Sequence, residues 1–162
     1  YVLFMGDYGA AAPWNDSSVR GCKRFLERVA GLTDIMTEEP AAKDMEVKIH
    51  KAIKKVSSDI EAMKFNTAIA CLMTLINEIY AVGKISKDDL VIFIKLLCPF
   101  APHLCEEIWE TIGGEGLLSL SQWPEYEESK TVEDSIEIGV QVNGKVRGTI
   151  VIPNGCAKEE AS

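Results

Sequence analysis

The sequence predicts a mainly α-helical protein, in which an antiparallel helix bundle is followed by a small β-hairpin. Three observations support this. Before residue 113, apolar side chains recur at helical spacing over long stretches. Short segments rich in glycine, proline or capping residues separate these stretches. Residues 136–152 instead alternate apolar and polar positions. The chain has 162 residues, of which 47% are hydrophobic, so it is long enough to bury a core.

The first three helices follow from periodicity and capping. We expect the first at residues 17–36, after the capping side chains of residues 15–18. The second is expected at 41–63, where apolar residues recur at steps of four and three. The third should run from Phe65 to Gly83 and is apolar on two sides, which predicts a place in the bundle centre. The short connections favour antiparallel neighbours.

We expect the bundle to be organised around residues 90–109. A fourth helix should start at Ser86 or Lys87 and end before Pro99, which lacks a backbone donor and crowds the preceding turn. Pro102 suits the first turn of a new, short helix that closes at residues 113–114. Two apolar helices meeting at a sharp corner predict a rigid centre.

The hairpin is predicted at about residues 135–152, and two registers compete for it. A two-residue Asn143-Gly144 turn would pair Val140 with Arg147 and so mix apolar with polar positions. A three-residue loop, 142–144, would pair Val140 with Val146. Because cross-strand partners share a face, the second register separates a dry side from a polar one. We therefore expect the three-residue loop, with two hairpin cations on one polar face.

The change of pattern along the chain also predicts its organisation. We expect residues 1–12 to be the tail of an upstream element and a linker. Residues 13–126 should form the helical bundle. Residues 127–162 should begin a small α+β domain that is truncated at the end of the chain.

Net charge limits the possible functions. At −8, the chain as a whole does not favour nucleic-acid binding, so only a local group of cations could support it. The predicted first helix carries four cations at close spacing, and the hairpin carries two near its tip; these are Arg20, Lys23, Arg24, Arg28, Lys145 and Arg147. A solvated helix face explains the first group equally well. We expect Lys48, Lys51 and Lys55 on the second helix to be ordinary surface.

Nothing in the sequence predicts catalysis or metal binding by this chain. His50 and His103 have no neighbours at metal-ligand spacing. The five cysteines form no C-x-x-C pair, and we expect reduced thiols that pack as small apolar groups. No apolar run reaches the roughly 18 residues that span a bilayer. We therefore expect no catalytic residue, metal or cofactor here.

Several segments resemble one known family. Residues 65–70, 98–109 and 123–124 resemble the anticodon-binding helical domain of class Ia aminoacyl-tRNA synthetases. Residues 140–148 resemble the hairpin that opens the small C-terminal domain of bacterial leucyl-tRNA synthetases, and residues 1–6 and 24–28 resemble the passage after their catalytic core. The helical motifs alone would also fit the equivalent domain of valyl-, isoleucyl- or methionyl-type enzymes.

This resemblance implies the fold of a class Ia anticodon-binding domain and a role in docking tRNA(Leu). The full-length enzyme would ligate leucine to tRNA with ATP and magnesium, as a cytoplasmic monomer that binds neither DNA nor a membrane. This chain alone would be inactive. Residues 84–87 mimic the family's K-M-S-K-S motif, but they join two predicted bundle helices, and we reject them as catalytic. The alternative is a helical module that binds protein partners, which the net charge favours.

Overall fold

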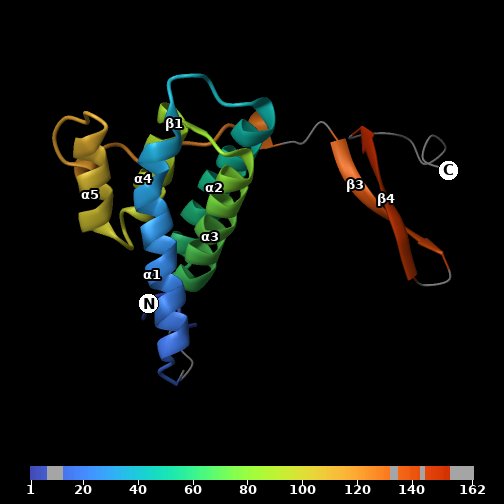
Figure 1. Cartoon of the computed structure of the whole chain (residues 1–162), viewed down its shortest axis with the longest axis horizontal. Helices are drawn as coiled ribbons and strands as arrows, with labels where there is room; N and C mark the ends of the chain where they lie inside the picture. The colour runs from blue at the N-terminus through green and yellow to red at the C-terminus, as the bar shows by residue number, and fades with distance from the viewer. Residues whose placement is uncertain (7–12, 132–134, 143–144, 154–162) are drawn as a thin grey trace.

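The computed structural model describes residues 1–6, 13–131, 135–142 and 145–153, the last two segments as backbone. The described residues form a helical bundle followed by a β-hairpin, which confirms the predicted fold class (Figure 1). The bundle helices are α1 (Asp16–Ala30), α2 (Lys43–Glu61), α3 (Phe65–Val82), α4 (Lys87–Leu97) and α5 (Pro102–Thr111). The hairpin strands are β3 (Ser135–Val142) and β4 (Lys145–Pro153).

Helix α1 begins as predicted but ends earlier than expected. The side chain of Asn15 accepts a hydrogen bond from the Ser17 amide at 2.9 Å and caps the first turn. After Ala30 the chain tightens into a 3₁₀ helix (Gly31–Ile35) and then becomes the short strand β1 (Met36–Thr37). This strand pairs in parallel with β2 (Ile85–Ser86). The predicted helix over 17–36 is wrong at this end, because that pairing requires extended backbone.

The α4–α5 corner forms as the two prolines predict. Ser86 caps α4, since its hydroxyl accepts a hydrogen bond from the Asp89 amide at 3.1 Å. Pro102 occupies the first turn of α5. Buried residues of both helices join one core with α1, α2 and α3; among them are Leu90, Phe93, Ile94, Leu97, Cys105 and Ile108.

Helix α3 packs against α1, α2 and α4. Gly83 ends it in the left-handed region, with φ of 78°, as its sequence position predicts. Contrary to our expectation from the sequence, α3 is long and apolar enough to cross a membrane by length and composition. Six of its residues are buried, and they face the other helices: Ala68, Ile69, Leu72, Leu75, Ile76 and Ile79. Packing against the other helices therefore accounts for the apolar character of this face, which is 33% of the helix.

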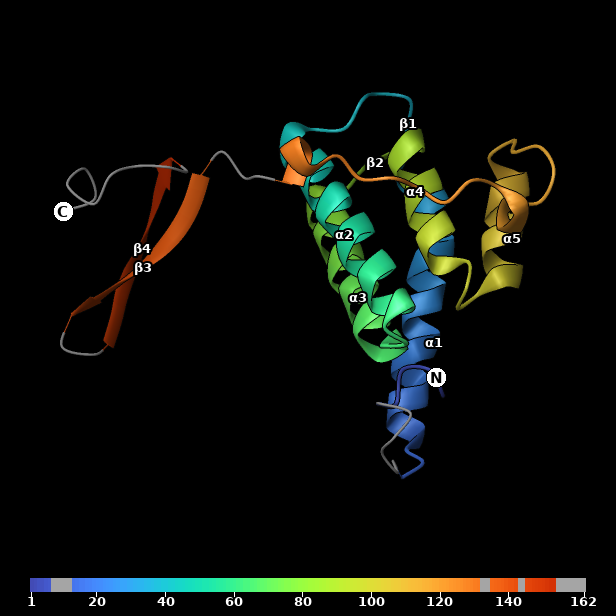
Figure 2. The same ribbon diagram turned by 180° about the vertical axis from the view of Figure 1, so that it is seen from behind.

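A return segment, which we define as residues 117–131, crosses from α5 over α4 to α2 (Figure 2). The Lys95 ammonium donates a hydrogen bond to the Gln122 carbonyl at 3.2 Å. The Trp123 indole donates to the Ser57 hydroxyl on α2 at 2.8 Å. Further along, the Glu127 amide donates to His50 Nδ1 at 3.1 Å. These contacts attach the return segment to the bundle.

The hairpin register corrects our prediction. Val142 pairs with Lys145, so two residues separate the strands, and the expected three-residue loop 142–144 is wrong. The register then shifts, because Val140 pairs with Gly148 while Gln141 pairs with Val146. Arg147 is thus the extra residue of a bulge in β4.

The bulge explains how apolar positions still meet across a two-residue turn. Beyond it, Ile138 lies opposite Ile150, and Ile136 lies opposite Ile152. One inserted residue in a strand restores the matching of apolar with apolar positions that a two-residue turn alone would lose. The predicted pairs themselves are wrong, because Val140 lies opposite Gly148 and not Val146, and Ile136 lies opposite Ile152.

Candidate nucleic-acid interface

The first predicted group of cations lies on α1, and three of its four members are exposed. Arg20 and Arg24 lie one helical turn apart and make no hydrogen bond or ion pair with any residue that the structure describes. Lys23 is 3.6 Å from the Glu27 carboxylate, but both side chains are largely exposed, so this ion pair is weak. This part of α1 can therefore offer its charges to a ligand.

Arg28 has a different environment. Its guanidinium donates to the Asn77 side-chain carbonyl at 2.6 Å and to the Ile76 carbonyl at 3.4 Å. It also lies 4.7 Å from the centre of the Tyr80 ring, and the Tyr80 hydroxyl donates to the Arg28 carbonyl at 2.8 Å. These contacts join α1 to α3, so they favour a structural role for Arg28 over the ligand contact that the sequence suggests.

The two hairpin cations belong to β4. The backbone places Lys145 at the end of the strand, next to the turn, and Arg147 in the bulge. Their side chains, and hence the predicted shared polar face, lie outside the described residues.

The structure also brings together three lysines that we expected to be ordinary surface. Lys48, Lys51 and Lys55 of α2 line one side of a groove of about 300 Å³. The other side comes from α3 and includes Thr74 and Glu78. The spacing of the lysines in the sequence shows that they share a face of α2, but only the packing of α3 beside them creates the groove.

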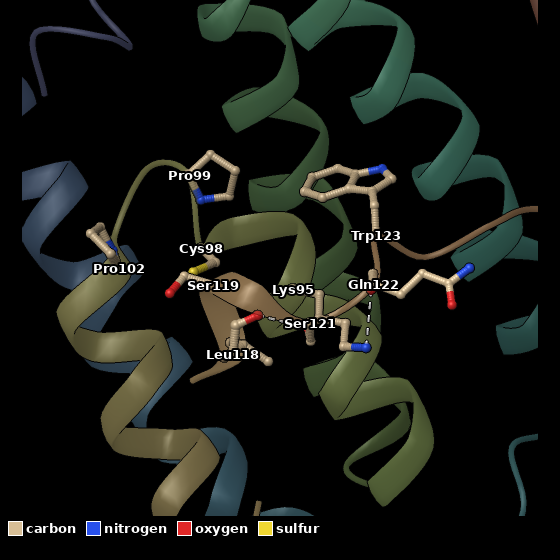
Figure 3. A pocket seen from close by; sticks show the side chains of 9 residues that line it. All are labelled: Lys95, Cys98, Pro99, Pro102, Leu118, Ser119, Ser121, Gln122 and Trp123. Atoms are coloured by element: carbon tan, nitrogen blue, oxygen red, sulfur yellow. Dashed lines mark hydrogen bonds between the residues drawn. The ribbon is translucent and has the colours of Figure 1, made fainter. Parts of the chain in front are cut away.

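A separate pocket of about 350 Å³ lies at the α4–α5 corner, under the return segment (Figure 3). Its lining is mainly apolar and includes Pro99, Pro102, Leu118 and Trp123. The Lys95 ammonium at its edge is bonded to the backbone, as described above.

The chemical groups in that pocket do not form a catalytic site. Burial raises the pKa of the Cys98 thiol, so the thiol stays protonated and is a poor nucleophile. The lining includes no carboxylate and no histidine that would act as a base. Among the described residues, no group of three or more histidine, cysteine, aspartate or glutamate side chains could hold a metal ion.

The chain was then compared with known proteins. Residues 42–161 match the family model described as "Anticodon-binding domain of tRNA ligase". The chain is 44% identical to the leucine–tRNA ligase of Alkaliphilus oremlandii over 153 residues, 94% of this chain and 19% of that protein. It is 42% identical to the leucine–tRNA ligase of Bdellovibrio bacteriovorus over 167 residues, 99% of this chain and 21% of that protein.

A solved structure shows the same fold. It is the ternary complex of an Agrobacterium radiobacter K84 LeuRS with tRNA and LeuAMS, which the chain matches with a TM-score of 0.78 and 32% identity. The match covers 99% of this chain and 23% of that one. The chain thus spans about a fifth of the length of its curated relatives. These findings confirm the resemblance that the motifs indicate, and the chain belongs to the family of anticodon-binding domains of tRNA ligases.

Proposed function

We propose that this chain binds tRNA(Leu) within a leucine–tRNA ligase and positions it for attachment of leucine. Similarity to leucine–tRNA ligases over nearly the whole chain supports this, as does the likeness to a LeuRS solved with tRNA. ATP, with magnesium, would act at catalytic residues elsewhere in the longer protein. We further propose that the ligase works as a cytoplasmic monomer and binds neither DNA nor a membrane.

The observation that carries the proposal is the exposed pair Arg20 and Arg24 on α1. Two arginines one turn apart have Cβ atoms about 6 Å apart, and each guanidinium can donate two hydrogen bonds to a phosphate. Phosphate contacts position RNA without reading its sequence. Because the chain carries a net charge of −8, such contacts must be local and should be strongly weakened by salt. Lys23, and Lys145 and Arg147 on the hairpin, would add to them.

The double variant Arg20→Gln/Arg24→Gln tests the role of α1. We expect weaker binding of tRNA(Leu), and a plot of log affinity against log salt that is less steep by about two, since two phosphate contacts are lost. Filter binding at several salt concentrations measures both. The control Lys54→Gln/Lys84→Gln removes two cations that lie elsewhere and pair with Glu128 and Glu39. If the affinity and the salt slope equal those of the control, α1 is not part of the tRNA-binding surface.

The hairpin needs a separate variant, Lys145→Gln/Arg147→Gln, measured in the same way. We expect it to reduce the salt slope, and an unchanged slope would remove the hairpin from the site. If the unmodified chain binds no tRNA(Leu) even at low salt, the proposed function itself fails, and the alternative of a helical module for protein partners is favoured.

A further inference from the structure

Helix α3 presents an uncharged stripe of exposed residues to solvent. The stripe consists of Ala70, Thr74, Asn77 and Ala81, at steps of four, three and four, so they share one helix face. All are short side chains and none is ionisable. A large ligand can therefore approach the backbone of α3 closely along this stripe.

One side of the stripe is the lysine-lined groove between α2 and α3. Lys55 follows Lys48 by seven positions in α2, with Lys51 between them, so the row is about 10 Å long along the helix axis. Thr74, a member of the stripe, also lines the groove. The stripe and the row of ammonium groups are thus adjacent, and the row extends along the direction of both helices.

Carboxylates near the groove form ion pairs with its lysines. The Lys48 ammonium lies 3.5 Å from Glu78, and Lys55 is paired with Asp59. Burial opposes ionisation of Asp59, but hydrogen bonds from Lys55 and Thr67 outweigh it and lower its pKa, so the carboxylate stays charged. The partly exposed Lys48–Glu78 pair contributes only about 1 kcal/mol or less, so an RNA phosphate can compete for the Lys48 ammonium. Lys55 is 53% exposed, and its ammonium has three donors, so it can face a phosphate while it keeps its bond to the buried Asp59.

The other side of the stripe is the basic face of α1. The Arg28 guanidinium reaches Asn77, a member of the stripe, and this contact fixes which face of α1 is turned toward α3. Arg24 lies one turn before Arg28 on that same face and is exposed. Figure 1 shows α1 and α3 running alongside each other. The uncharged stripe is therefore flanked by cations of α1 on one side and of α2 on the other.

We propose that the sugar–phosphate backbone of RNA lies along this three-helix face, with phosphates bound by Lys48, Lys51 and Lys55 and the α3 stripe beneath it. This rests on the proposed function, that the chain binds tRNA, and adds a second row of contacts, on α2. Helical RNA is recognised largely through its shape and its phosphate and 2′-hydroxyl groups, which suits a smooth surface between two rows of cations. The Thr74 hydroxyl, which donates to the Ala70 carbonyl at 3.1 Å, would lie against the ligand.

The first test is Lys48→Gln/Lys51→Gln, compared with the control Lys54→Gln/Lys84→Gln. Both doubles change the net charge equally, so long-range electrostatics are matched. Lys55 is left in place because its loss would leave the buried Asp59 carboxylate without its ion-pair partner. We expect the salt slope of tRNA(Leu) binding to fall by about two in the groove double and to stay near the unmodified value in the control. Equal slopes in the two doubles would overturn the proposal.

The second test places charge on the stripe itself. Thr74→Glu adds a carboxylate at an exposed position of α3, and Thr74→Gln adds nearly the same bulk without charge. We expect Thr74→Glu to weaken tRNA(Leu) binding by about fivefold or more relative to Thr74→Gln, because like charges repel across a partly dehydrated contact. Equal affinities of the two variants would also overturn the proposal.

The outcomes separate this inference from the function on which it rests. Failure of the unmodified chain to bind tRNA(Leu) would refute both. Binding that depends on Arg20 and Arg24, but not on Lys48, Lys51 or the charge at Thr74, would refute the three-helix face alone.

Discussion

The steric constraint at Gly114 comes from one neighbouring ring. A Cβ at this position would lie 2.0 Å from Trp109 Cε2 and 2.1 Å from Cδ2, while the Gly114 amide donates to the Trp109 carbonyl at 2.8 Å. We predict that Gly114→Ala lowers the free energy of unfolding by about 1–3 kcal/mol, because the indole must move out of its packed position. Urea denaturation measures this.

Gly21, in the middle of α1, provides the matched control. A Cβ there would meet no atom within 4 Å. Gly21→Ala should therefore stabilise the protein by about 0.5–1 kcal/mol, since alanine restricts the unfolded chain and favours helix. If both alanine variants change stability in the same direction, the assigned packing of Trp109 on Gly114 is wrong.

The contact between α1 and α3 depends on the side chain of Arg28. Its two hydrogen bonds and its position against the Tyr80 ring attach the last turn of α1 to α3. We predict that Arg28→Gln lowers the free energy of unfolding by about 1.5–3 kcal/mol, the range for hydrogen bonds to a charged group. Arg24→Gln, one turn earlier and exposed, should stay within about 0.5 kcal/mol of the unmodified protein.

Urea denaturation of both variants shows whether Arg28 stabilises the fold while Arg24 does not. If Arg28→Gln and Arg24→Gln are equally stable, the contacts of Arg28 between α1 and α3 contribute nothing to the free energy of unfolding. If the predicted difference is found, variants at Arg28 are unsuitable for testing RNA binding, because their effect on affinity would include a loss of structure in α1.

The whole bundle should be stable without the hairpin. Of the residues that the structure describes, the core cluster lies between Phe25 and Leu118, and the return segment attaches to α2 up to Lys130. We predict that a chain ending at Thr131 unfolds at the same urea concentration as the full chain. A clearly lower midpoint would mean that residues after Thr131 stabilise the bundle. The shortened chain should still bind tRNA(Leu), with a smaller salt slope.

The sequence by itself determined which segments form helices and several of their boundaries. The Asn15 cap, the left-handed Gly83 and the Pro99–Pro102 corner depend on residues a few positions apart, so their signals are complete in the local pattern. The motifs over residues 65–70, 98–109 and 140–148 also indicated the family. These predictions agree with the structure because helix propensity, capping and the core stripe all favour the same arrangement.

Only the tertiary structure decided what depends on partners distant in the chain. Helix α1 ends where it does because Met36 pairs with Ile85, and the helical periodicity of the sequence cannot predict this pairing. Arg28 and Arg24 have the same spacing and charge, yet only Arg28 meets Asn77, 49 residues away. The groove lined by Lys48 exists because α3 packs beside α2. In each case the local pattern shows which face a residue occupies, but the packing of the helices determines what that face meets.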